Sequence, residues 1–211
     1  MPTERSASDF PVAGSRLPIP AFEVVAVASS AGGVTALSKL LSAMPAAFPA
    51  AIVVVQHLDP RHKSLIVEIL DRRTPLHVEE ANDGSRLMPG SVLVAPPNRH
   101  LLVNGDGSVS LTESELVHFV RPSADLLFDS VAAAYRERAI AVVLTGAGTD
   151  GAMGVQAIKK MGGTVLAEDD RTAEFSGMPS AAIHTGDVDF VLQLEEIASA
   201  LVSLVVRGAI E

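Results

Sequence analysis

The sequence predicts an α/β fold, a doubly wound and mainly parallel sheet with helices on both faces and an antiparallel hairpin insert. Short runs that are apolar throughout alternate along the chain with helical patterns. Strands without a polar face are typical of parallel sheets that helices cover on both sides. Near the middle of the chain, an alternating stretch is centred on Asn-Gly-Asp-Gly at 104–107, which is a strong hairpin signal.

The predicted elements follow one another without an internal repeat or a linker. Strands are expected at 23–28, 50–56, 76–81, 91–96, 139–145, 164–168 and 188–193, with the hairpin at 100–113. Helices are expected at 35–44, 64–73, 123–138, 152–161 and 195–206. We therefore expect one domain at 22–211, preceded by a flexible tail at 1–21 that is rich in Pro and Ser.

The composition narrows the class of protein. The 211 residues suffice for one domain with its own core, which must be aliphatic because 48% of residues are hydrophobic and only 4% aromatic. A net charge of −9 without a basic stripe argues against a nucleic-acid partner. The absence of cysteine excludes disulfides and thiol nucleophiles. Neither a signal peptide nor an apolar run of about 18 residues is found, so we expect a cytoplasmic protein without membrane insertion.

Polar side chains that could carry chemistry stand where three predicted strands end. Ser30 follows the first strand, His57 the second and Asp150 the strand at 139–145. Ligands of doubly wound sheets bind beyond the carboxyl ends of the strands, so we expect these residues at one edge. A serine nucleophile needs a base, and the base needs a carboxylate that orients it. The set is therefore a candidate catalytic triad.

Each of the three residues also has a purely structural interpretation. Ser30 could cap the helix that follows it, and Asp150 could cap the helix that begins near Gly151. His57 could be an ordinary hydrogen-bonded histidine in a loop. The coincidence of all three at one sheet edge favours the catalytic interpretation.

Glycine-rich loops flank two of the candidate residues. Gly32 and Gly33 permit close backbone approach beside Ser30. The backbone amides of the loop Gly-Ala-Gly-Thr-Asp-Gly at 146–151 could face a developing oxyanion. Neither loop matches a phosphate-binding motif, and the aspartate in the second loop would repel a phosphate.

A metal site is the weaker interpretation of the histidines. His57, Asp59 and His62 lie close together in the chain, but their spacing matches no zinc template. We therefore expect neither a metal nor another cofactor.

Several ordered motifs resemble the catalytic domain of the chemotaxis protein-glutamate methylesterases, the CheB family. The resemblance runs from about Val24 to the C-terminus and rests on ASSAGG, VVVQHLDP, DGSRLMPGSVLVAPPNRH, RPSADLLFDSVA, VVLTGAGTDGAMG and SGMPSAA. It implies an α/β fold and a serine esterase without a cofactor. The implied substrates are glutamate γ-methyl esters on the cytoplasmic helices of chemoreceptors, which yield glutamate and methanol. Some members of the family also deamidate receptor glutamines.

The resemblance implies roles for individual residues. It assigns the nucleophile, the base and the third triad member to the residues already found at the sheet edge, namely Ser30, His57 and Asp150. Ser29 stands where the family usually has alanine. We expect the oxyanion to bind backbone amides near Ala31 and Ala147, and Ala147 stands where many relatives have methionine.

Two questions stay open at the level of sequence. About 20 residues precede the first strand, too few for the phosphorylated receiver domain that controls the usual enzyme, since a domain needs at least about 50. We therefore expect a phosphodonor such as acetyl phosphate to leave the rate unchanged, and a regulatory partner in trans is an open alternative. The alternative function is a non-catalytic, partner-binding domain of a sensory pathway.

Overall fold

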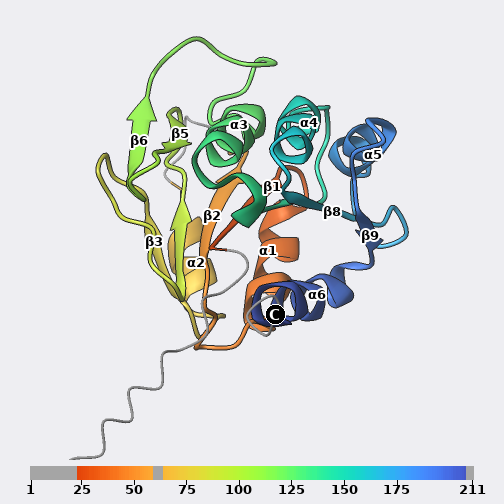
Figure 1. The fold of residues 1–211 in the computed structure, drawn as a ribbon, viewed down its shortest axis with the longest axis horizontal. Coiled ribbons are helices and arrows are strands. Elements are labelled where there is room, and N and C mark those ends of the chain that lie inside the picture. The colour runs from red at the N-terminus through yellow and green to blue at the C-terminus, as the bar shows by residue number, and fades with distance from the viewer. Residues whose placement is uncertain (1–22, 59–63, 208–211) are drawn as a thin grey trace, which may run out of the picture.

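Seven parallel strands form the central sheet of the computed structural model, which describes residues 23–58 and 64–207 (Figure 1). In sheet order these are β3 His77–Glu80, β4 Ser91–Val94, β2 Ala51–Gln56, β1 Val24–Ser29, β7 Ala139–Val143, β8 Thr164–Glu168 and β9 Phe190–Leu192. From β1 the chain first adds β2, β3 and β4 on one side of this strand, and it then crosses to the other side of β1 to add β7, β8 and β9. The strand order thus reverses between β1 and β7, which is the topological switch point where ligands of such sheets bind.

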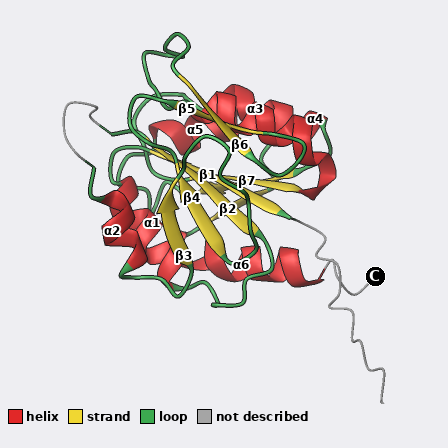
Figure 2. Cartoon of the chain, turned by 90° about the vertical axis from the view of Figure 1, so that its left-hand side faces the viewer, coloured by secondary structure: helices red, strands yellow, loops and turns green. Residues whose placement is uncertain are grey.

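Helices cover both faces of this sheet, as the predicted class requires. One layer consists of α1 Gly33–Ser42, α2 Ile66–Asp71 and α6 Leu194–Arg207. The other consists of α3 Ala124–Tyr135, which continues as the 3₁₀ turn η1 Arg136–Arg138, with α4 Ala152–Lys160 and α5 Gly177–His184. Figure 2 shows the two layers on opposite sides of the strands. No helix among the described residues is long and apolar enough to cross a membrane.

The core is divided by the sheet into two aliphatic layers. Along β1, Val25 and Val27 face the cluster under α1 and α6, whereas Ala26 and Ala28 face the cluster under α3 and α4. Successive strand residues point to opposite faces, so a strand buried on both sides must be apolar at every position. This explains why the sequence pattern is continuous rather than alternating.

The predicted hairpin is confirmed, and one helix was missed. Strands β5 His100–Val103 and β6 Val109–Thr112 pair antiparallel and form a separate two-stranded sheet. Helix α5 begins with Gly-Met-Pro, and these residues read as a turn in the sequence. The predicted tail at 1–21 lies outside the described residues.

Candidate active site

The carboxyl ends of β1, β2 and β7 bring the three predicted residues into one pocket. Ser30, His57 and Asp150 line this pocket, which has a volume of about 350 Å³ and is called the active pocket below. Ser30 and Asp150 come from the two strands between which the sheet order reverses. The expected meeting of these residues at one sheet edge is therefore found in the structure.

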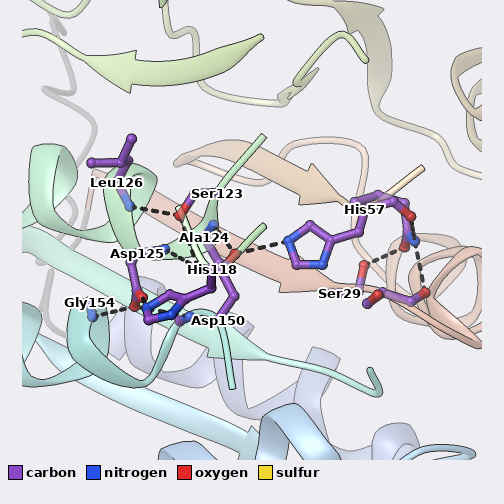
Figure 3. A network of polar contacts seen from close by, with 12 residues as sticks. Ser29, His57, His118, Ser123, Ala124, Asp125, Leu126, Asp150 and Gly154 are labelled. Atoms are coloured by element: carbon purple, nitrogen blue, oxygen red, sulfur yellow. Dashed lines mark hydrogen bonds and ion pairs between the residues drawn. The ribbon is translucent and has the colours of Figure 1, made fainter. Parts of the chain in front are cut away.

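His57 and Asp150 are joined directly. The Nε2 atom of His57 lies 2.9 Å from Oδ2 of Asp150, and Figure 3 shows the imidazole ring pointing toward this carboxylate. Asp150 is only 4% exposed. Among the described residues, no hydrogen bond joins the Ser30 hydroxyl to His57. Catalytic hydrogen bonds are often long or poorly aligned in a site without substrate, so this does not argue against Ser30 as a candidate nucleophile.

Asp150 is anchored by the first turn of α3. Its Oδ2 also accepts from the amide of Ala124 at 2.6 Å, and its Oδ1 accepts from the Ser123 hydroxyl at 2.9 Å and the Asp125 amide at 3.2 Å. All four partners of this carboxylate, His57 included, can act as donors. A helix N-terminus attracts negative charge, so the ionised form is favoured here.

The electrostatics of Asp150 follow from this anchoring. Burial by itself would raise the pKa of the carboxyl group. The hydrogen bonds from His57, Ala124 and Asp125 oppose burial and hold the pKa of Asp150 below its ordinary value. The group is therefore ionised at neutral pH, as a carboxylate that stabilises an imidazolium must be.

The capping interpretations of Ser30 and Asp150 are wrong. The N-cap residue of α1 is Gly32 and that of α4 is Gly151, and neither helix has a side-chain cap hydrogen bond at that residue. Asp150 does sit at a helix N-terminus, but the helix is α3, to which it is a neighbour in space rather than in sequence. A capping residue usually precedes its helix directly in the chain, whereas the helix that Asp150 caps begins 26 residues earlier, at Ala124.

Asp125 makes the reciprocal contact and was not predicted. Its Oδ1 accepts from the amides of Gly151 at 2.9 Å and Gly154 at 2.8 Å, in the first turn of α4. Asp150, which directly precedes the N-cap of α4, therefore stabilises the N-terminus of α3. Asp125, in the first turn of α3, stabilises the N-terminus of α4. A Cβ atom at Gly154 would lie 2.6 Å from Cβ of Phe128 on α3, so the close approach of the two helices requires glycine there. Burial, followed by the negative charge of Asp150, raises the pKa of Asp125.

Gln56 connects His57 to the loop that carries Ser30. It is 3% exposed, and its Oε1 accepts from the Ser29 hydroxyl at 2.7 Å. Its Nε2 donates to the carbonyls of Ser30 at 2.7 Å and His57 at 2.9 Å. One buried amide therefore fixes the backbone of two triad candidates, a role that sequence analysis did not assign. The sequence does show that Gln56 ends a strand directly before His57, and this position could have indicated a supporting role.

Replacing Gln56 by leucine should lower both stability and turnover. The substitution leaves two carbonyls and one hydroxyl without their partner, and each unsatisfied buried polar group costs about 1–3 kcal/mol. Since the Ser30 and His57 backbones lose a shared anchor, we also expect the rate to fall at least about tenfold. Thermal unfolding and ester hydrolysis, measured well below the melting temperature, test the two effects separately. A lower melting temperature with an unchanged kcat would contradict the positioning role.

Backbone amides that could bind an oxyanion lie beside Ser30. The amides of Ala31 and Ala147 donate to no other described residue, and Ala147 lines the active pocket. A Cβ atom at Gly146 would lie 2.9 Å from Cβ of Ser30, so the loop after β7 can pass close to Ser30 because it has glycine at this point. The geometry is compatible with the predicted oxyanion amides, whose role remains a prediction.

No cluster of three or more potential metal ligands occurs in the part of the chain that the structure describes. The candidate metal residues Asp59 and His62 lie outside the described residues. His57 uses its Nε2 atom for the contact with Asp150.

Comparisons with known proteins agree with the fold and the motifs. Residues 25–201 match the protein-family profile described as CheB methylesterase. The crystal structure of the Thermotoga maritima CheB methylesterase catalytic domain superposes with a TM-score of 0.84 at 40% identity, covering 87% of this chain and 99% of that one.

The relatives include proteins of about the same length as this chain and proteins that are much longer. A protein from Leptospira interrogans is 39% identical over 183 residues, which are 87% of this chain and 95% of that protein. A Burkholderia lata protein named protein-glutamate methylesterase/protein-glutamine glutaminase 2 is 44% identical over 184 residues, which are 87% of this chain but only 54% of that longer protein. The chain therefore belongs to the CheB methylesterase family.

Proposed function

We propose that this chain is a serine esterase that hydrolyses glutamate γ-methyl esters on the cytoplasmic helices of methylated chemoreceptors or related sensory proteins. The products are glutamate and methanol. The observation that carries the proposal is the His57–Asp150 pair, which lies in the same pocket as Ser30. The family membership and the name of the Burkholderia relative support the substrate class. The domain at 22–211 is proposed as the catalytic unit, acting in the cytoplasm.

The first half of the reaction forms an acyl-enzyme. Ser30 Oγ attacks the ester carbonyl carbon while His57 takes the hydroxyl proton. Because Nε2 of His57 is held by Asp150, Nδ1 is the ring nitrogen left to receive that proton. The carboxylate stabilises the imidazolium that forms, and the amides of Ala31 and Ala147 would donate to the oxyanion.

The second half releases both products. The imidazolium returns its proton to the departing methoxide, so methanol leaves and the glutamyl group stays bound to Ser30 as an ester. A water molecule then attacks this ester, with His57 again as base, and glutamate and the free serine are restored. A glutamine side chain would give the same acyl-enzyme with loss of ammonia, which accounts for deamidation as a second activity of one site.

The purified chain should release methanol from a methylated receptor fragment. We expect steady turnover with one methanol formed for each carboxylate that appears, measured by gas chromatography and by the charge shift of the fragment. The Ser30→Ala variant is the control. The alternative, a partner-binding domain, predicts that wild type and variant bind the fragment equally and that neither releases methanol.

A further inference from the structure

A loop rises beside the active pocket between the hairpin and α3. It spans residues 113–121 and projects from the body of the molecule, where Figure 1 shows it in green between β6 and α3. At its tip, Val117 and Val120 exchange two backbone hydrogen bonds of 2.9 and 3.2 Å. His118 and Phe119 are the two residues between them. The tip is thus a two-residue turn of the hairpin type.

The backbone of this turn is strained. His118 has a φ of 49° and Phe119 a φ of 66°, so both central residues are in the left-handed region. Hairpin turns with two such residues usually contain Asn or Gly, because a side chain at positive φ is costly and an aromatic one especially so. Strain of this kind persists only where the surrounding structure holds it, and it is frequent at functional sites.

Several contacts hold the loop in place. Arg121 donates to the carbonyls of Glu113 and Ser114, each at 2.7 Å, and its Nε and Nη2 donate to Oδ1 of Asn98 at 3.0 and 2.7 Å. The His100 ring lies 3.0 Å from the carbonyl of Glu115. The loop is therefore fixed at its base on both sides.

The turn itself is tied to the triad's support. Nε2 of His118 lies 3.2 Å from Oδ2 of Asp125, and Figure 3 shows the His118 ring beside this carboxylate. The other oxygen of Asp125 accepts from Gly151, the residue that follows Asp150. The turn is thus connected through one carboxylate to the loop that carries the third triad member.

The side chain of Phe119 is too exposed to stabilise the fold by packing. Its side chain is 94% exposed, the largest exposure among the large hydrophobic residues described. It nevertheless lines the active pocket together with Ser30 and His57. It also lines an adjoining hollow of about 320 Å³, in which Leu116 provides a second apolar side chain that is 54% exposed. An aromatic ring that a fixed backbone presents to solvent at the rim of a site is typical of a contact residue rather than of a core residue.

We infer that Phe119 is a specificity-determining residue that packs on the apolar surface of the protein substrate beside the reacting glutamyl ester. The inference rests on the proposed function. An ester side chain can enter the active pocket, but the helix that carries it must remain outside, against the rim where Phe119 stands. Because the backbone of the turn is already fixed, little conformational entropy is lost when the substrate packs against Phe119. His118 and Arg121 act as positioning residues for the ring.

The test compares a protein substrate with a small ester. For Phe119→Ala we expect kcat/KM on a methylated receptor fragment to fall about tenfold, because a central aromatic contact of an interface carries an effect of this size. Hydrolysis of p-nitrophenyl acetate, which enters the active pocket but has no helix to pack against its rim, should fall distinctly less than hydrolysis of the fragment. The melting temperature should not change, since the ring has no packing to lose.

Two variants serve as controls. Phe190→Ala removes the same ring from the edge strand β9, where it is 42% exposed, and should leave both activities unchanged. Phe119→Gly removes the ring and relieves the positive φ, so it should lose activity on the fragment while melting at or above the wild-type temperature.

Each other outcome overturns the inference. An equal loss on both substrates would mean that Phe119 shapes the active pocket itself, and no loss on either would mean that the rim touches no substrate. If wild type cleaves p-nitrophenyl acetate but not the methylated fragment, the proposed substrate is wrong and the inference falls with it. If wild type cleaves neither substrate, the proposed esterase function itself fails, and the inference that rests on it fails too.

Discussion

Replacing Ser30 by alanine should lower the rate of methyl-ester hydrolysis by a factor of about 10⁴ or more, because removal of a serine nucleophile abolishes the covalent path. Among the described residues, the Ser30 hydroxyl makes no hydrogen bond, so the variant should melt at nearly the wild-type temperature. Methanol release and thermal unfolding of the same preparation measure the two quantities. A folded but inactive variant is the expected result.

Ser29→Ala is the matched control, one residue away. The Ser29 side chain is fully buried, and its hydroxyl donates to Gln56 Oε1 at 2.7 Å. It therefore supports the loop and is not free to attack a substrate. We expect a small loss of stability, about 1 kcal/mol, and retention of most activity. A loss of turnover in Ser29→Ala together with normal turnover in Ser30→Ala would show that the nucleophile had been placed one residue too late.

The meeting of the triad candidates could be predicted because it depends on topology alone. Parallel strands deliver their carboxyl ends to one edge, so a polar residue after each of three apolar runs is enough to place Ser30, His57 and Asp150 together. The sequence could also predict that β1 and β2 are buried on both faces, since the first five residues of each strand are apolar and only the last one, Ser29 or Gln56, is polar. These conclusions need no knowledge of side-chain contacts.

The supporting contacts could not be predicted because they join segments that are distant in sequence. Asp150 accepts from the N-terminus of α3, 26 residues earlier in the chain at Ala124, rather than from α4 which follows it. Asp125 reads in the sequence only as an acidic residue in a first helical turn, and its partners at the start of α4 appear only once the helices pack. The same holds for the strained turn at His118 and Phe119, where the sequence has none of the usual turn residues.

Replacing Asp150 by asparagine should lower turnover by a factor of about 10⁴, the size of the effect when the same exchange is made in serine proteases. An amide cannot stabilise the imidazolium of His57, and it can favour the wrong tautomer of the ring. Asparagine is a good helix cap, but it does not fit here, because each carboxylate oxygen accepts from two donors. Either placement of the amide NH₂ group turns it toward donors, so the variant should also lose about 1–3 kcal/mol of stability.

The loss of stability and the loss of catalysis can be separated with pH and with a second variant. The lowered pKa of Asp150 means that its ionised form stabilises the fold above its unfolded pKa of about 3.9, and that this contribution disappears as pH falls through the folded pKa. The difference in melting temperature between wild type and Asp150→Asn should therefore shrink below about pH 4. Ser123→Ala is the matched control, because it removes one hydrogen bond to Asp150 and the cap of α3 but leaves the charge beside His57. It should cost about 0.5–2 kcal/mol of stability and keep most of the turnover. If Asp150→Asn instead keeps near-normal turnover while Ser123→Ala is equally destabilised, Asp150 only anchors α3 and another group must orient His57.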